Sequence, residues 1–145
     1  MILLDTNVVS ESRKLGSGRV DPGFAAWLGG VSPDSTYLSA MSIFELEHGV
    51  LRMERRDQAQ GPLLRRWLMD VVHPTFDGRI LPMSAEVAVR CAQLHVPDPK
   101  SERDAWIAAT ALVHGMTLAT RNISDFETTG VPLVNPWQSG VGAGI

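Results

Sequence analysis

The chain has 145 residues, of which 44% are hydrophobic and 20% are charged, and this composition is typical of one globular domain with a sizeable core. Its formal net charge of -3 and sequence pI of about 5.7 differ from the basic balance of most nucleic-acid-binding domains, although local basic patches remain possible. No apolar run approaches the roughly 18 residues of a membrane span, and the first residues do not resemble a secretory signal. The single cysteine, Cys91, excludes an internal disulfide and a cysteine zinc cluster, so we expect a cytoplasmic protein.

Strands and helices are predicted to alternate along the chain. In chain order, the pattern predicts a strand at residues 2–4, helices at 7–15 and 22–29, a strand at 36–40, helices at 42–56 and 63–72, a strand at 79–83, helices at 84–94 and 101–114, and strands at 117–120 and 131–134. Gly61-Pro62 is expected to interrupt the chain between two helices. In the helix after it, Leu64, Trp67, Leu68 and Val71 are expected to face inward.

This alternation predicts an α/β fold in which a parallel sheet of about five strands is sandwiched between helices. No linker or repeat divides the chain, so we expect a single domain over residues 1–145. The glycine-rich residues 138–145 are expected to form a flexible tail.

Four acidic residues stand near the ends of predicted strands or the starts of predicted helices. Asp5 follows the first strand, Glu45 lies one turn into the helix after the second strand, and Asp125 comes just after the fourth strand. Asp104 lies in the first turn of the alanine-rich helix. Because the carboxyl ends of parallel strands open on one edge of a sheet, these carboxylates can converge there.

Each acidic residue also has a purely structural interpretation. Asp5 or Thr6 could cap the first helix, and the pairs Ser42-x-x-Glu45 and Ser101-x-x-Asp104 resemble capping boxes. Asp125 could cap a turn. Capping does not require all of these sites to fall at one edge of the sheet, so their joint occurrence favours a functional site.

Carboxylate oxygens gathered in this way are typical ligands of Mg²⁺ or Mn²⁺. Such ions can activate water and neutralise the charge of a phosphodiester during hydrolysis. The sequence contains no phosphate-binding glycine loop, and His48, His73, His95 and His114 have no metal-like spacing. The residues therefore favour divalent-metal hydrolysis.

Five segments of the chain resemble, in order, the PIN-domain toxins of type II toxin–antitoxin systems, in the VapC family and its FitB-like subgroup. These segments are MILLDTNVVS at 1–10, LSAMSIFELEHGV at 38–50, DAWIAATA at 104–111, LATRNISDF at 118–126 and NPW at 135–137. The resemblance implies a PIN fold, a Mg²⁺- or Mn²⁺-dependent endoribonuclease activity and a homodimer. It also implies a cognate antitoxin protein, through which alone the toxin would contact operator DNA.

The resemblance further implies that Asp5, Glu45 and Asp104 hold the metal, with Thr6 and Thr120 as supporting polar groups. Relatives can carry Asp at the position of Asn122, where this chain has an uncharged amide. Either Asn122 supports a site of three carboxylates, or Asp125 turns in as a fourth catalytic group.

Two further sets of residues are candidates for contacts with partners. The basic residues at 13–19 and 52–66 are possible contacts for the RNA backbone, or solvated helix faces. Phe24 and Trp27 are possible antitoxin contacts, or parts of the core.

Two other classes of function stay open at this point. A phosphatase could use Asp5 as a covalent nucleophile, although position 7 is Asn where that chemistry usually has a second carboxylate. A non-catalytic module could keep the fold only to bind an antitoxin and DNA. Against it, carboxylates brought together without a metal would repel one another.

Overall fold

A computed structural model describes residues 1–138 of the chain. Residues 139–145, which include nearly all of the predicted tail, lie outside the described residues. Among the residues described, no helix is both long and apolar enough to cross a membrane.

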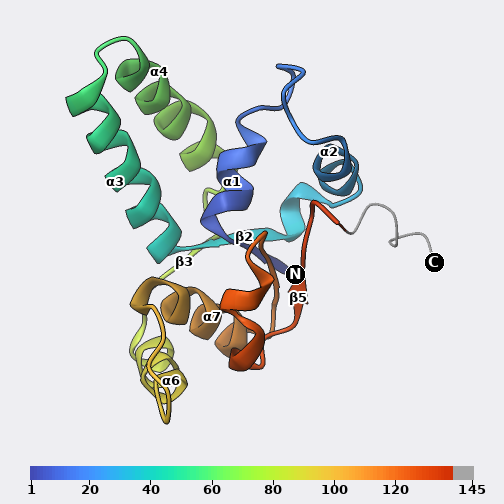
Figure 1. The fold of residues 1–145 in the computed structure, drawn as a ribbon, viewed down its shortest axis with the longest axis vertical. Coiled ribbons are helices and arrows are strands. Elements are labelled where there is room, and N and C mark those ends of the chain that lie inside the picture. Colours follow the sequence, from blue (N-terminus) through green and yellow to red (C-terminus); the bar gives the residue numbers. More distant parts are fainter. Residues whose placement is uncertain (139–145) are drawn as a thin grey trace.

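The centre of the molecule is a parallel sheet whose strands have the order β3-β2-β1-β4-β5, which confirms the predicted α/β fold (Figure 1). The strands are β1 (Ile2–Leu4), β2 (Thr36–Ser39), β3 (Ile80–Leu81), β4 (Thr117–Ala119) and β5 (Leu133–Val134). The central strand β1 pairs with both β2 and β4, and Leu3 lies opposite Tyr37 on one side and Leu118 on the other. The carboxyl ends of these three strands therefore lie side by side.

Helices cover both faces of the sheet (Figure 1). The helices are α1 (Thr6–Ser12), α2 (Pro22–Gly29), α3 (Ala40–Arg56), α4 (Gln60–Trp67), α5 (His73–Thr75), α6 (Ala85–Leu94) and α7 (Glu102–His114). Helices α1 to α4 lie on one face and α6 and α7 on the other.

Each face has its own buried core because successive side chains of a strand point to opposite sides. Leu4 belongs to the core beneath α1 to α4, together with Leu38, whereas Leu3 belongs to the core beneath α7, together with Leu118 and Ile107. All five side chains are almost completely buried. The short apolar run of β1 therefore forms a strand that is buried on both faces, as predicted.

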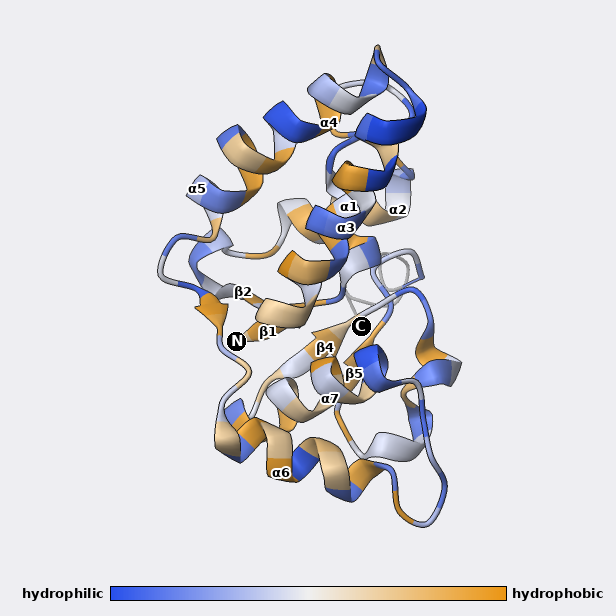
Figure 2. Ribbon diagram, turned by 90° about the vertical axis from the view of Figure 1, so that its left-hand side faces the viewer, coloured by the Kyte–Doolittle hydropathy of each residue, from blue (hydrophilic) through white to orange (hydrophobic). Residues whose placement is uncertain are grey.

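The segment around Gly61-Pro62 differs from the prediction. These residues do not interrupt the chain between helices but lie in the first turn of α4, where a proline is tolerated because its missing N–H would have no helical partner. The preceding α3 and α4 form a hairpin whose polar connection lies far from the sheet (Figure 2).

The inward face of the helix after Gly61 also differs at one position. Leu68 is buried as expected, but Val71 is 51% exposed and Val72 is buried instead. Residues Leu68–Val72 form a π-helical turn, which accommodates one extra residue and so shifts the buried stripe by one position.

Candidate active site

Asp5 is held in a buried position at the carboxyl end of β1. Its backbone N–H donates to the carbonyl of Ala119 in β4 (2.9 Å), and its side chain is only 6% exposed. One carboxylate oxygen, Oδ1, accepts from the backbone N–H of Thr6 (2.8 Å), and Oδ2 accepts from the hydroxyl of Thr120 (2.7 Å). Burial raises the pKa of Asp5, and these two hydrogen bonds partly offset that rise. Asp5 thus caps α1 with one oxygen, while its second oxygen is bound by a separate strand end.

Glu45 is brought to the same edge by α3, although α3 does not begin where the sequence suggested. The N-cap is Ser39, whose hydroxyl accepts from the backbone N–H of Met41 (3.0 Å), so Ser42 lies inside the helix and the predicted capping box with Glu45 does not form. Instead, the hydroxyl of Thr6 donates to Oε1 of Glu45 (2.7 Å) and lies 3.0 Å from the buried hydroxyl of Ser42.

Asp104 lies in the first turn of α7, and it too is free of the capping role that the sequence allowed. The N-cap residue Ser101 makes no side-chain capping bond. Burial, followed by the negative charges of Asp5, Asp125 and Glu45, raises the pKa of Asp104 to about 6. Asp104 therefore lies near enough to Asp5, Asp125 and Glu45 for their charges to act on its carboxyl group.

The two candidates for a fourth position differ in their placement. Asn122 lines the cleft beside Asp5, and its backbone N–H donates to the Thr120 hydroxyl (3.0 Å). Asp125 is exposed at the end of the 3₁₀ turn Ile123–Asp125. Its charge still contributes to the raised pKa of Asp5 and of Asp104.

These groups border an open polar cleft of about 450 Å³. The cleft is lined by Asp5, Thr6, Asn7, Ser10, Glu11, Lys14, Glu45, Asp104, Arg121, Asn122 and Trp137. Sequence reasoning assigned Thr6 to the site and treated Lys14 as a possible RNA contact, but it did not assign Asn7, Ser10 and Glu11. Together with Lys14, these three recur at the i, i+3, i+4, i+7 spacing of one helical face, so a search for a polar stripe on α1 would have found them.

The donor set of the cleft suits a hard divalent cation, because it consists of carboxylate, hydroxyl and amide oxygens. Within residues 1–138 no three acidic, histidine or cysteine side chains are already grouped so that they could hold an ion. Glu45 is engaged by Thr6, and its Oε2 lies 3.8 Å from Nη1 of Arg103. A bound Mg²⁺ or Mn²⁺ would offset the mutual repulsion of Asp5, Asp104 and Glu45.

Not all of the proposed partner contacts are available. Arg65 forms ion pairs with Glu47 (2.6 Å) and Glu54 (3.0 Å), so its charge is matched within the α3–α4 hairpin. Phe24 is fully buried, which confirms that it belongs to the core and excludes it as an exposed contact. Trp27 is half-buried and packs against the core.

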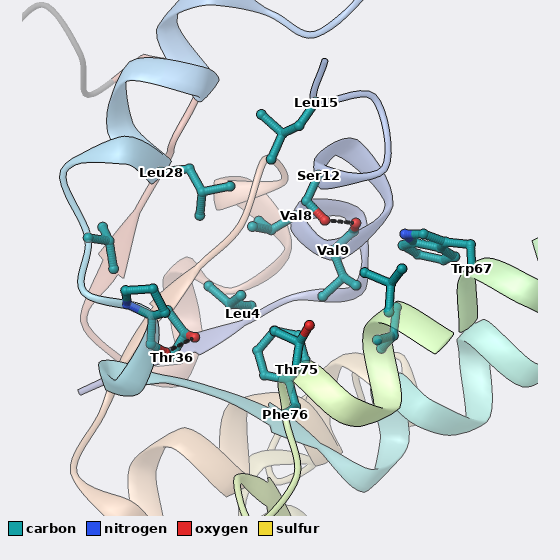
Figure 3. A pocket seen from close by; sticks show the side chains of 14 residues that line it. Leu4, Val8, Val9, Ser12, Leu15, Leu28, Thr36, Trp67, Thr75 and Phe76 are labelled. Carbon is teal, nitrogen blue, oxygen red and sulfur yellow. Dashed lines mark hydrogen bonds between the residues drawn. The ribbon is translucent and has the colours of Figure 1, made fainter. Parts of the chain in front are cut away.

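A second cavity, of about 280 Å³ and largely apolar, lies on the other side of α1 (Figure 3). In α1 it is lined by Val8, Val9 and Ser12, and Trp67 and Phe76 contribute from the segment that follows α3. The helix α1 therefore separates the polar cleft from an apolar cavity.

Comparison with known proteins agrees with this fold. The family model described as "PIN domain" matches residues 2–130. The chain is 34% identical to the VapC ribonuclease Y4jK of Sinorhizobium fredii, over 95% of this chain and 99% of the relative. It is 37% identical to the toxin FitB of Neisseria gonorrhoeae, over 94% and 99% of the two chains. The crystal structure of FitAcB from Neisseria gonorrhoeae superposes with a TM-score of 0.85 at 35% identity, covering 95% of this chain and 99% of that one.

The parallel sheet and the helices that cover it are thus those of a PIN domain. The chain belongs to the PIN domain family, within the VapC toxins and their FitB-like subgroup.

Proposed function

We propose that this chain is a Mg²⁺- or Mn²⁺-dependent endoribonuclease that serves as the toxin of a VapBC-type toxin–antitoxin module. One observation carries the proposal. Asp5, Glu45 and Asp104 come from three different elements of the chain, and all three line one cleft at the carboxyl edge of the sheet. The relatives named as a VapC ribonuclease and as a toxin support both the reaction class and the biological role.

Asp5, Glu45 and Asp104 would hold the metal. Bound at these oxygens, the ion supplies activation of a water molecule and neutralisation of charge on the phosphodiester. Thr120 fixes one oxygen of Asp5, and Thr6 positions Glu45. The pKa of Asp104 is raised to about 6, so this carboxyl would be largely ionised at neutral pH, and Asn122, which lines the same cleft, would add an uncharged ligand.

The proposal is tested by cleavage of an RNA panel with added Mg²⁺ or Mn²⁺, comparing wild type with Asp5→Asn and Asp104→Asn. Each substitution removes one charge at nearly constant size, and we expect folded proteins whose cleavage falls by at least about 100-fold, because each removes a direct ligand of the metal. Asp70→Asn is the matched control, since Asp70 is exposed outside the cleft. Chelation should abolish cleavage by wild type.

The same proteins separate the alternative functions. Equal cleavage by all variants would show that the carboxylates are structural and would contradict the metal-nuclease proposal. A trapped phospho-aspartyl form of wild type that is absent in Asp5→Asn would establish the phosphatase instead. Intact partner binding without metal affinity would favour the non-catalytic module.

The proposed partners are a cognate antitoxin and a second copy of this chain, with operator DNA contacted only through the antitoxin. The apolar cavity beside α1 supports a protein partner, because Val71 and Leu15 at its border leave about half of their surface exposed. Co-expression with the neighbouring gene product, followed by gel filtration and light scattering, would measure both assemblies.

A further inference from the structure

Two cations line the acidic cleft, and they differ in how their charge is balanced. Nζ of Lys14 lies 3.0 Å from Oε1 of Glu11, so that charge is matched locally. Among residues 1–138, Arg121 forms no ion pair with a carboxylate. Its guanidinium instead lies over the ring of Trp137, with Cζ 5.1 Å from the ring centroid.

Trp137 in turn packs against the ring of Phe24. Its ring centroid lies 4.9 Å from that of the fully buried Phe24, with an interplanar angle of 46°. The backbone N–H of Trp137 donates to Oδ1 of Asn135 (2.9 Å), and Nδ2 of Asn135 donates to the carbonyl of Arg121 (3.5 Å). The segment that ends the described chain thus returns to brace Arg121 at both its backbone and its side chain.

The brace fixes Arg121 on one flank of the carboxylates. Arg121 follows Thr120, whose hydroxyl binds Asp5, and its backbone N–H donates to Oδ1 of Asn7 (3.4 Å). In the sheet, the end of β4 lies beside the end of β1, and the end of β2, which leads to Glu45, lies on the other side of β1. Arg121 and Glu45 therefore flank Asp5 from opposite sides.

A guanidinium stacked on an aromatic face keeps its N–H edge free for an anion, and its planar fork matches the oxygens of a phosphate. Four carboxylates line this cleft, so a guanidinium without a carboxylate partner among the described residues is the group suited to a polyanionic strand. We propose that Arg121 binds the phosphate adjacent to the scissile one in the bound RNA, and that Trp137 is the positioning residue that holds Arg121 there. This inference rests on the proposed ribonuclease function.

The test compares wild type with Arg121→Ala, Arg121→Lys, Trp137→Leu and the control Arg90→Ala, whose arginine is exposed on α6 outside the cleft. For each protein we would measure kcat and KM on an end-labelled single-stranded RNA with Mn²⁺, the affinity for Mn²⁺ alone, and RNA binding by fluorescence anisotropy with Ca²⁺. Circular dichroism and thermal unfolding would establish that each variant is folded.

For Arg121→Ala we expect KM and the RNA dissociation constant to rise about tenfold or more, because the substitution removes one hydrogen-bonded charge contact. We expect kcat and Mn²⁺ affinity to stay within about twofold, because an adjacent phosphate is bound equally in the ground and transition states. The slope of log affinity against log salt concentration should shrink by about 0.7, as for one phosphate contact to a single strand. Arg121→Lys should recover only part of the loss, and Trp137→Leu should weaken RNA binding in the same direction by less.

RNA binding by Arg121→Ala equal to that of Arg90→Ala would overturn the assignment. A fall in kcat at unchanged KM would also overturn it, since Arg121 would then act on the reacting phosphate. If wild type binds RNA without cleaving it, the proposed function fails and with it the placement beside a scissile phosphate, while the binding data still decide whether Arg121 contacts the RNA. If wild type neither binds nor cleaves RNA, both proposals are rejected.

Discussion

At the scale of single residues, hydroxyl groups hold two carboxylates of the cleft in place. Thr120 and Thr6 each donate to one acidic residue, and the partners in the Thr120–Asp5 pair stand 115 positions apart in the chain. The four acidic residues could be selected from the sequence because each lies next to a predicted strand or helix end. The Thr120 contact follows from the pairing of β1 with β4, and the Thr6 contact follows from the pairing of β1 with β2. Both were suggested only by the family resemblance, because no local pattern encodes them.

The Thr120 contact gives a prediction about metal affinity. Thr120→Val keeps the shape of the buried side chain but removes the donor to Oδ2 of Asp5, which raises the pKa of that carboxyl further. We expect Mn²⁺ affinity at pH 7 to fall by about 10- to 100-fold, as for other losses of a group that orients a metal ligand. Thr117→Val, at the opposite end of the same strand, is the control and should bind as wild type does. Isothermal titration would measure both, and equal affinities would refute the role of Thr120.

At the scale of elements, the sequence predicted every strand and nearly every helix, and its errors have specific causes. The start of α3 is displaced because Ser39 and Ser42 are both suitable caps, and the choice depends on where β2 stops pairing with its neighbours. The glycine–proline pair looked like a break because local propensity does not reveal how closely two helices pack. The π-helical turn could not be predicted from the hydrophobic periodicity, because Val71 and Val72 are both apolar and only the structure shows which of them is buried.

The close packing of α3 and α4 gives a prediction about stability. A Cβ atom at Gly61 would lie 2.6 Å from the Cα atom of Glu54, a contact that the two helices can relieve only by moving apart. We expect Gly61→Ala to lower the free energy of unfolding by about 1–3 kcal/mol, the usual cost of overpacking. Gly49→Ala, in α3 with open space around the new methyl group, should instead raise it by about 0.5–1 kcal/mol. Urea denaturation would measure both values, and a loss at Gly49 equal to that at Gly61 would contradict the packing argument.

At the scale of the whole molecule, the acidic cleft lowers the folding stability of the metal-free protein. The folded protein raises the pKa of Asp104 from 3.8 to about 6, so between these values the folded state binds more protons than the unfolded state. The stability of the metal-free protein is therefore expected to fall as the pH rises through this window. Above pH 6 the contribution of Asp104 stays unfavourable until a cation offsets it.

This cost predicts that Asp104→Asn stabilises the metal-free protein at pH 7 to 8 and does so much less near pH 4, where Asp104 is largely protonated. Added Mg²⁺ should raise the melting temperature of wild type, in proportion to its binding, and should have little effect on the variant. Differential scanning calorimetry across the pH range, with and without chelator, would measure these differences. A variant that is less stable than wild type at pH 7 without metal would show that Asp104 contributes structurally instead.

The placement of the seven residues of α1 limits which amino-acid substitutions this helix can accept. Thr6, Asn7, Ser10 and Glu11 line the acidic cleft, and Val8, Val9 and Ser12 line the apolar cavity. Every position of the helix lines one of the two cavities, so none lies on a solvated face where substitutions would have no effect. A library of single substitutions should therefore find few tolerated changes in α1. A substitution in this helix that alters one cavity is also constrained by the need to preserve the other.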